Sequence, residues 1–341
     1  MQRTNYYLGI DISAEQFSAS CITNPDNLVF PTGKFQNSFE GFDKLLSVVN
    51  KHKINPLETI ICMEATGVYG ENLSYFLVSK GFNLCIEAPH KIKNKTKDSP
   101  RKNDLIDANY IAEYAYRYSD KLSVWKPKEE ILEQIQVLLT TREHLTVQLT
   151  ANQNALKTLS YKHYQTPLAN QIYEKTIVKL KEHIKEIDSE IKKLIDKDDS
   201  FKHKVSLAKS VPGVGLLLAA NLLVLTNGFT KNLNHKKVAA YSGICPYEQQ
   251  SGTSLNRKPR SKRCGPGKLR KLLYLASLSV RTHNTNFKKY FLRKVAEGKN
   301  KRVVINNISN KLLKIIFAVV KSGIRYNDSY KSFNPNLLKT A

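Results

Sequence analysis

The stretch YYLGIDISAEQFSASCITNPDNLVFP (6–31) decides the fold of the first third of the chain. It contains three runs that are rich in β-branched and aromatic residues, YYLGIDIS (6–13), QFSASCITN (16–24) and NLVFP (27–31), with a Pro-Asp-Asn turn before the third. Runs of this kind, bounded by turn residues, predict β-strands. We therefore expect a meander of three strands at the start of the chain.

The following residues alternate between helical and strand patterns. SFEGFDKLLSVVNKHK (38–53) and YGENLSYFLVSKG (69–81) have apolar residues at helical spacing, whereas TIICMEA (59–65) and FNLCIEAP (82–89) are short apolar runs typical of buried strands. A basic loop (90–102) and a further helix, NDLIDANYIAEYAYRY (103–118), come next. This order of elements is that of a ribonuclease-H-like mixed sheet flanked by helices.

Four acidic residues stand where one metal site would need them. Asp11 and Glu64 each close an apolar strand, and Asp104 and Asp107 open a helix with a spacing that puts both on one face. Four carboxylates at one point repel each other unless cations lie between them. Oxygen ligands favour Mg²⁺ or Mn²⁺, and two such ions can clamp the attacking and leaving oxygens of a phosphodiester. Each acid taken alone is also compatible with a turn or first-turn role.

The charge balance indicates a polyanionic partner. The chain has 54 Lys+Arg against 29 Asp+Glu, a net charge of +25. Nucleic acid is the commonest partner of such a surface. An anionic membrane surface is the alternative, but no segment is both strongly amphipathic and placed as an anchor, and the longest apolar run, GLLLAANLLVL (215–225), is too short to span a bilayer, so we expect no membrane partner. The N-terminus, MQRTNYYLGID, runs straight into a predicted strand, so we expect no signal peptide. Five scattered cysteines without a CxxC pattern favour reduced thiols in a cytoplasmic protein, without zinc.

Two segments concentrate the positive charge. HKIKNKTKDSPRK (90–102) carries six Lys/Arg and one acid, and residues 257–302 carry sixteen Lys/Arg and only Glu297 as an acid. The first segment is equally compatible with a solvated, mobile loop, whereas a purely solvated face usually mixes signs. The candidate nucleic-acid contacts are Lys91, Lys93, Lys95, Arg257, Lys258, Arg260, Lys262, Arg263, Lys268, Arg270 and Lys271.

The middle of the chain has the heptad pattern of a coiled-coil hairpin. Apolar residues recur from Ile131 to Leu159 and again from Ile177 to Leu194, with a break at YKHYQTPLAN that contains Pro167. Arg142 and Asn152 are polar residues in the first seam, where they could fix the register or the oligomeric state. An antiparallel hairpin that serves subunit assembly is our preferred interpretation, and a purely intramolecular spacer is the alternative.

The last part of the chain predicts a mostly helical domain. SVPGVG (210–215) before an apolar helix fits a helix-hairpin-helix device or a plain turn equally well, and helices are expected at 266–282, 285–297 and 301–322. Ser251 lies in the polar loop QQSGTS, where a serine is usually a turn residue, and no local residue is an obvious base. The expected domains are 1–125, 126–200 and 201–325, with a poorly ordered tail at 326–341.

Together these stretches resemble one family, the insertion-sequence transposases with an Asp-Glu-Asp-Asp motif, also called bridge-RNA-guided serine recombinases. The resemblance is carried by GIDIS, MEATGVYG, RKNDLIDANYIAEYA, SVPGVG, AAYSGICPYEQQSG and SKRCGPGKLRKLLYLASL. It runs from about residue 6 to residue 322, and the order and spacing of the motifs make it specific. Cys264 stands where the family usually has glycine, which concerns the local loop and not the assignment.

The resemblance implies a RuvC-like N-terminal domain, a coiled coil and a C-terminal transposase domain, and with them a mechanism. It assigns metal binding, two Mg²⁺ or Mn²⁺ ions, to Asp11, Glu64, Asp104 and Asp107, and the role of nucleophile to Ser251. It further implies donor and target DNA as substrates, a structured non-coding RNA as guide, a homodimer or homotetramer, and a nucleoid-associated protein in a prokaryotic cytoplasm. Base pairing by the RNA would leave the protein to recognise backbone and shape.

Three other functions compete with this interpretation. A structure-selective endonuclease, such as a junction resolvase, would use the same acids with water and leave Ser251 idle. A sugar-kinase or actin-like ATPase shares a strand like LGIDIS, but the chain has no later Gly-rich motif for adenosine. A non-catalytic RNA-binding protein derived from a transposase would have no need to keep the four acids and Ser251.

Overall fold

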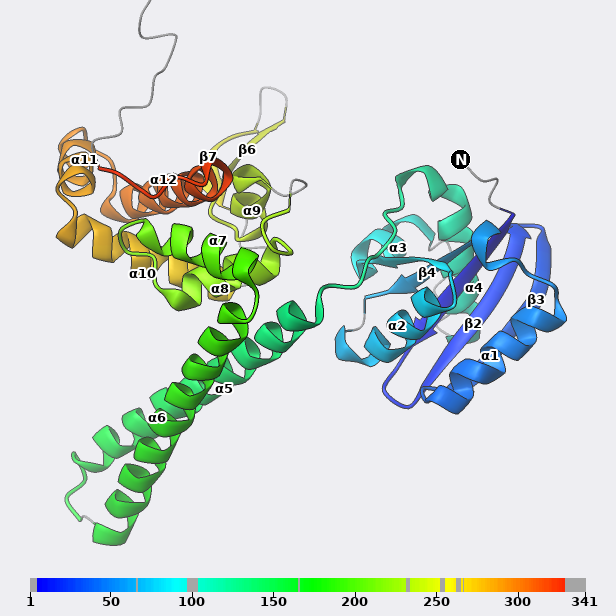
Figure 1. Cartoon of the computed structure of the whole chain (residues 1–341), viewed down its shortest axis with the longest axis horizontal. Helices are drawn as coiled ribbons and strands as arrows, with labels where there is room; N and C mark the ends of the chain where they lie inside the picture. The colour runs from blue at the N-terminus through cyan, green and yellow to red at the C-terminus, as the bar shows by residue number, and fades with distance from the viewer. Residues whose placement is uncertain are drawn as a thin grey trace, which may run out of the picture. The chain divides into compact units, whose positions relative to one another are not determined.

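The computed structural model describes residues 5–65, 67–96, 104–164, 166–230, 234–251, 255–261, 265 and 267–328, without the side chains at 93–96, 104–106, 249–251 and 255–260. The chain divides into two compact units, Met1–Pro127 and Lys128–Ala341 (Figure 1). Each unit has its own hydrophobic core and is described separately.

The first unit is built on a five-stranded mixed sheet with the order β3-β2-β1-β4-β5. The strands are β1 (Tyr6–Ile12), β2 (Gln16–Asn24), β3 (Asn27–Gln36), β4 (Thr59–Glu64) and β5 (Asn83–Glu87). The first three form the expected antiparallel meander, and β4 and β5 run parallel to β1. The mixed sheet of the prediction is therefore confirmed, and it is consistent with a ribonuclease-H-like domain.

Alternate residues of β1 enter two different cores. Leu8 and Ile10 pack against α1 (Phe39–Lys51) and α2 (Glu71–Ser79) on one face, whereas Tyr7 packs against α4 (Asp104–Arg117) on the other. This alternation is the period of a strand that is covered on both faces. Figure 1 shows α1 and α2 on one side of the sheet and α4 on the other.

Three local features of this unit differ from the prediction. Strand β3 continues to Gln36, beyond the expected end at Pro31, because an edge strand tolerates a residue without an N–H. The predicted basic loop begins as a helix, α3 (Pro89–Thr96), and its remainder, 97–102, lies outside the described residues. The helix expected at 69–81 is present as α2, but it begins two residues later, after a short 3₁₀ turn (Gly67–Gly70).

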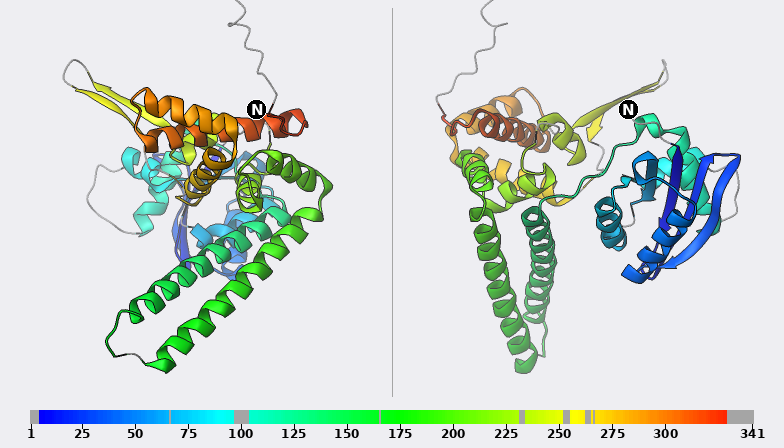
Figure 2. Two further views of the ribbon diagram at one scale, coloured as in Figure 1. Left: turned by 90° about the vertical axis from the view of Figure 1, so that its left-hand side faces the viewer. Right: turned by 45° about the vertical axis from the view of Figure 1, so that its right-hand side comes forward.

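The second unit begins with two helices of 30 residues each, α5 (Glu130–Leu159) and α6 (Pro167–Asp196), which pack as a hairpin (Figures 1 and 2). Arg142 makes a two-pronged ion pair with Asp188 of α6, with N–O distances of 2.6 and 3.0 Å. Asn152 instead donates to the Gln148 carbonyl of its own helix. Of the two polar seam residues, only Arg142 therefore links the helices.

The rest of this unit is helical apart from one β-hairpin. The helices are α7 (Asp199–Ser210), α8 (Leu216–Leu225), α9 (His235–Tyr241), α10 (Gly267–His283), α11 (Thr285–Ala296) and α12 (Lys301–Ser322). The hairpin, β6 (Pro246–Ser251) and β7 (Leu255–Ser261), replaces the polar loop that the sequence predicted around Ser251. One apolar core is shared by the start of α5, the end of α6, and helices α7, α8, α10 and α12.

Among the described residues, helix α12 is long and apolar enough to cross a membrane by length and composition alone. Its apolar stripe, which includes Ile308, Leu312 and Ile316, is fully buried in the core of this unit. The stripe therefore has a packing role in the folded chain.

The cysteines inside the described part of the chain, Cys21, Cys62, Cys85 and Cys245, are free thiols. Cys62 and Cys85 face each other on β4 and β5. Burial raises the pKa of Cys21 to about 12 and that of Cys85 to about 11. Thiols that stay protonated in this way behave as small apolar residues, as the sequence predicted.

Candidate active site

Asp11, the second-to-last residue of β1, and Glu64, the last residue of β4, lie at the same level of two neighbouring parallel strands. Ile10 pairs with Met63, and each acid is the next residue in its strand. Because Ile10 and Met63 lie in the core under α1 and α2, the alternation of strand side chains turns both acids to the face that α4 covers. Both side chains are half-buried. With neighbouring strands about 4.8 Å apart, the two carboxylates lie side by side.

Helix α4 runs antiparallel to β1 across this face. The ring of Tyr7 meets that of Tyr116 at 5.2 Å, and Gly9 lies under the backbone of Ala108 and Ala112. Two further residues along β1 lead to Asp11, and about one further turn back along α4 leads to its first turn. The start of α4 therefore lies at the same end of the sheet as Asp11.

That first turn carries the other two predicted acids. Asp104 is the first residue of α4, and Asp107 follows three residues later with a half-buried side chain. The side chain of Asp104 lies outside the described part, so its distance from the other acids is not defined. Among the described residues, no three His, Cys, Asp or Glu side chains come close enough to hold a metal ion.

The donor chemistry of this edge fits a hard divalent ion. Asp11, Glu64 and Asp107 offer only carboxylate oxygens, and the cysteines on the same face lie one row further back, at Cys62 and Cys85. Carboxylates on two adjacent strands and a facing helix can supply the oxygen ligands that Mg²⁺ and Mn²⁺ prefer.

Sequence reasoning missed a third carboxylate in the same row. Glu87 ends β5 and pairs in register with Glu64, so that Asp11, Glu64 and Glu87 follow one another across three adjacent strands. Glu87 is buried, with 7% of its surface exposed. The signal was present in the sequence, since FNLCIE ends in an acid after an apolar run as TIICME does.

A lysine from the next helix neutralises Glu87. The Lys91 ammonium lies 2.6 Å from the Glu87 carboxylate, and its side chain is 53% exposed. Lys91 was predicted as a nucleic-acid contact together with Lys93 and Lys95, which lie further along α3 with side chains outside the described part. Among these three lysines, the structure therefore defines the side-chain position only for Lys91.

Ser251 is the last residue of β6 and pairs with Leu255 across the hairpin. Its side chain is not described, and neither are those of Arg257, Lys258 and Arg260 in β7. Lys262 and Arg263 lie outside the described residues altogether. The strand position of Ser251 corrects the expected loop position, because the complementary run 255–261 pairs with it.

Three other predicted nucleic-acid contacts have partners inside their own unit. Lys268 donates to the Leu139 carbonyl of α5, and its burial lowers the pKa of its ammonium. Arg270 donates to the Ser242 carbonyl at 3.1 Å, and Lys271 lies 3.9 Å from Glu143. Their contact with nucleic acid stays a prediction, while Lys268 and Arg270 clearly tie α10 to its neighbours.

The VPGVG segment forms the connection between α7 and α8. Gly213 has a φ of 77°, and a Cβ there would come 2.7 Å from a Val280 methyl and 2.8 Å from the Ala276 carbonyl. The connection therefore packs tightly on α10, and only glycine fits both the left-handed backbone and the close approach. This packing explains the glycine without any ligand.

Two family models match most of the chain. One, described as a transposase, matches residues 8–160, and the other, described as the IS116/IS110/IS902 family of transposases, matches residues 205–292. The first covers the acid-bearing unit from residue 8 and the whole of α5, and the second covers the segment that bears Ser251 and α10.

Curated relatives agree with these matches. The chain is 28% identical over 318 residues to the pilin gene-inverting proteins of Moraxella lacunata and Moraxella bovis, covering 92% of this chain and 95% of the relatives. It is 24% identical over 268 residues to the transposase for insertion sequence element IS1533 of Leptospira borgpetersenii, covering 71% of this chain and 75% of the relative.

Proposed function

Because this chain belongs to the IS110 family of transposases, we propose that it cuts and rejoins DNA through a divalent-metal site and a serine nucleophile. Members of the family catalyse DNA strand transfer, so the chain is an enzyme that acts on the DNA of an insertion element. The proposal concerns how it does so: the metal, the nucleophile, the guide RNA and the assembly.

One observation carries the acid site. The register of β1 and β4 sets Asp11 beside Glu64, on the face over which α4 brings its first turn to the same end of the sheet. In this proposal Asp11, Glu64, Asp104 and Asp107 would hold two Mg²⁺ or Mn²⁺ ions. When bound, such ions supply Lewis-acid polarisation of a phosphodiester and neutralise the charge that develops on its oxygens.

The nucleophile would be Ser251. Its Oγ attacks the phosphorus of the scissile phosphodiester, the bond from phosphorus to one deoxyribose oxygen breaks, and that oxygen leaves as a hydroxyl after taking up a proton. The serine proton passes to solvent or to a base that the chain or the nucleic acid supplies. The covalent seryl–phosphate conserves the bond energy, and attack by the hydroxyl of a new strand reverses the step and frees Ser251.

The test is a covalent-adduct assay with end-labelled donor and target DNA in the presence of Mg²⁺. Ser251→Ala should abolish both cleavage and the protein–DNA adduct, whereas Asp11→Asn should abolish cleavage while DNA binding persists. If Ser251→Ala cuts DNA at the wild-type rate, the serine assignment is wrong and the water-using junction resolvase takes its place.

The relatives bear on the substrate arrangement. The Moraxella proteins are named for inversion of a pilin gene and the Leptospira protein for transposition of an insertion element. Inversion and transposition differ in the arrangement of the two DNA sites, and the same strand exchange can serve both. We therefore expect this chain to recombine a pair of specific DNA junctions in either arrangement.

The guide would be a structured RNA from the element. Support comes from the net charge of +25, which suits two polyanions at once and a nucleoid-associated enzyme of the cytoplasm. Purification of the full chain after expression from its own locus, followed by sequencing of bound RNA, tests this. Recovery of RNA fragments without a common origin in the element would contradict the guide.

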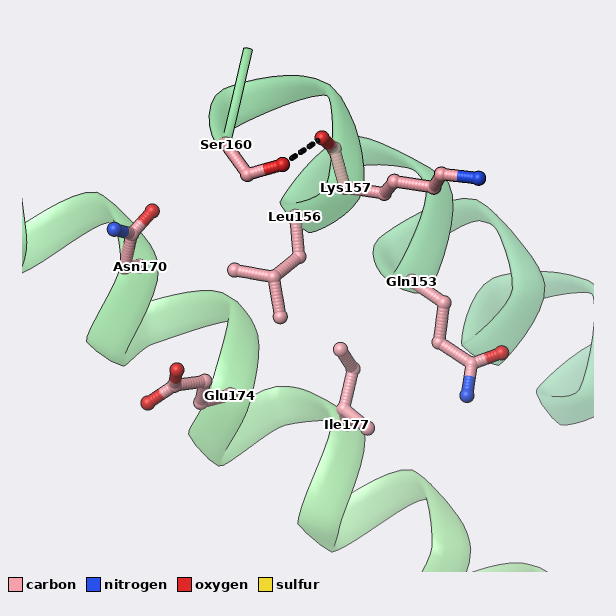
Figure 3. Close-up of a pocket in the computed structure, with 7 residues that line it drawn as sticks. All are labelled: Gln153, Leu156, Lys157, Ser160, Asn170, Glu174 and Ile177. Carbon is pink, nitrogen blue, oxygen red and sulfur yellow. Dashed lines mark hydrogen bonds between the residues drawn. The ribbon is translucent and has the colours of Figure 1, made fainter. Parts of the chain in front are cut away.

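The assembly would involve the end of the α5–α6 hairpin. A hollow of about 500 Å³ opens there between the helices, and Leu156 and Ile177 point into it (Figure 3). Tyr164, with 88% of its surface exposed, lies in the connection between α5 and α6, and Leu168, with 65%, lies in the first turn of α6. Apolar side chains that are exposed together commonly mark a protein interface. We propose that this end contacts a second copy of the chain.

The oligomeric state can be measured directly. Light scattering of the wild-type chain should give a dimer or tetramer, and Tyr164→Ser combined with Leu168→Ser should lower the mass toward the monomer. Val137→Ser removes an equally exposed apolar side chain near the other end of α5 and is the matched control. An unchanged mass in the double variant would exclude this end of the hairpin as the interface.

A further inference from the structure

Glu87 is a buried charge that the four-carboxylate site does not use. Its side chain is 8% exposed, and it stands next to Glu64 in the row of strand ends. Burial of a carboxylate is unfavourable unless a partner compensates it, and an apolar or amide residue usually serves packing as well. A charge at this position therefore calls for a function besides packing.

The partner of Glu87 reaches toward solvent. Lys91 stands at the start of α3, four residues after Glu87, and holds its ammonium 2.6 Å from the carboxylate although half of its side chain is exposed. An exposed lysine on its own samples many rotamers, and holding it in one of them costs conformational entropy. The buried carboxylate removes that freedom in advance and holds the ammonium at the edge of the acid row.

The Glu87 carboxylate also affects a residue of α4. Burial and then the Glu87 charge raise the pKa of Tyr114 in α4. Glu87 therefore lies within electrostatic reach of Tyr114 in α4, while its ion pair is with Lys91 in α3.

We propose that Glu87 is a positioning residue that holds the Lys91 ammonium where it contacts a phosphate of the DNA strand next to the carboxylate site. The inference rests on the proposed function, because it needs DNA to enter at that edge. A phosphate oxygen would accept a hydrogen bond from one ammonium proton while Glu87 keeps another, since the ammonium has three donors. No bond is made or broken in this role.

The experiment measures the salt dependence of binding to a fluorescently labelled DNA duplex, with Ca²⁺ in place of Mg²⁺ so that binding is read without cutting. Lys91→Met should weaken binding several-fold and reduce the log–log salt slope by about 0.9, the value for one phosphate contact. Glu87→Gln should give a similar loss, and the double variant should be no weaker than Lys91→Met alone. Lys91→Arg, which keeps the positive charge, should bind DNA like the wild type.

Matched controls lie at the opposite ends of β4 and β5, where the two strands begin. Lys80 follows the end of α2 just before β5 begins, so Lys80→Met removes the same charge away from the acid row. Glu58 precedes the start of β4, so Glu58→Gln makes the same carboxyl-to-amide exchange there. Neither should change the salt slope as much as the Glu87 and Lys91 variants.

Several outcomes overturn the inference. If Glu87→Gln binds like wild type while Lys91→Met does not, Glu87 does not position the lysine. If the two losses add, the residues act separately, and if Glu87→Gln only lowers the thermal midpoint, its role is structural. The proposed function fails differently, through persistent cleavage by Asp11→Asn or Ser251→Ala, and this result leaves the Glu87–Lys91 coupling unaffected.

Discussion

The Cα of Gly9 lies so close to α4 that a Cβ would come 2.1 Å from the Ala108 carbonyl oxygen. The same Cβ would come 2.3 Å from the Ala112 nitrogen. Both contacts are with helix backbone, which cannot rotate away as a side chain can. Gly9 therefore sets how closely α4 approaches the sheet and, with it, the distance from the first turn of α4 to Asp11.

Gly9→Ala should displace α4 and disturb the acid site. Overpacking of this kind typically destabilises by about 1–3 kcal/mol, and we expect the larger end because backbone must move. Urea unfolding of the variant measures the free energy, and cleavage at matched folded concentration measures the site. The control is Gly215→Ala, where a Cβ would have open space. Equal stability and cleavage in Gly9→Ala would contradict the close-approach account.

The Arg142–Asp188 pair should stabilise the α5–α6 hairpin. It is two-pronged and only partly exposed, with 19% and 35% of the side-chain surfaces accessible. We expect Arg142→Leu and Asp188→Leu each to destabilise the second unit by about 1–3 kcal/mol, because each leaves a half-buried charge without its partner. The double variant should lose less than the sum. Additive losses in thermal unfolding would show that the pair is not coupled.

The pH dependence of stability should report the segment after α12. Hydrogen bonds from Tyr326 and then Asn284 lower the pKa of Asp328, and Tyr326 is itself tied to Ser210 of α7. A carboxyl with a lowered folded pKa contributes stability above its unfolded pKa of about 3.9 and loses it as the pH falls through the folded pKa. The stability difference between wild type and Asp328→Asn should therefore shrink below about pH 4.

The stability that this segment contributes should also fall at high pH, where Tyr326 loses its proton. Burial, and then the hydrogen bond to Asp328, raises the pKa of Tyr326 to about 12. The protonated phenol therefore contributes stability below the unfolded pKa of about 10, and this contribution is lost as the pH rises toward 12. Tyr326→Phe should remove the dependence in urea unfolding between these values. A dependence that persists in Tyr326→Phe would assign it to another group.

Two lysines of the basic segment should behave differently. Lys268→Met removes the hydrogen bond to the Leu139 carbonyl and should destabilise the second unit by about 1–3 kcal/mol. Lys258→Met changes a residue of β7 and, as a predicted phosphate contact, should weaken DNA binding and reduce the salt slope by about 0.9. Thermal unfolding and salt titration of both variants separate the two roles. The reverse pattern would overturn this division.

Several expectations about the tail and the loops needed the structure. Tyr326 and Asp328, expected in a poorly ordered tail, are held by hydrogen bonds to Ser210 and Asn284, and residues 329–341 lie outside the described part. The strand position of Ser251 was missed because PYEQQS is polar and gains its strand character only by pairing with 255–261. Such pairing depends on a partner segment and leaves little mark on the local pattern.

The sequence by itself determined the order of strands and helices in the first unit, the two long helices of the second and the acids at strand and helix ends. Apolar periodicity and turn residues report local burial, which is why these features were accessible. Only the tertiary structure decided that Asp11, Glu64 and Glu87 form one row, that Lys91 neutralises Glu87, and that Arg142 meets Asp188. Strand register and helix approach depend on contacts between distant segments, such as Gly9 with α4, and no local pattern encodes them.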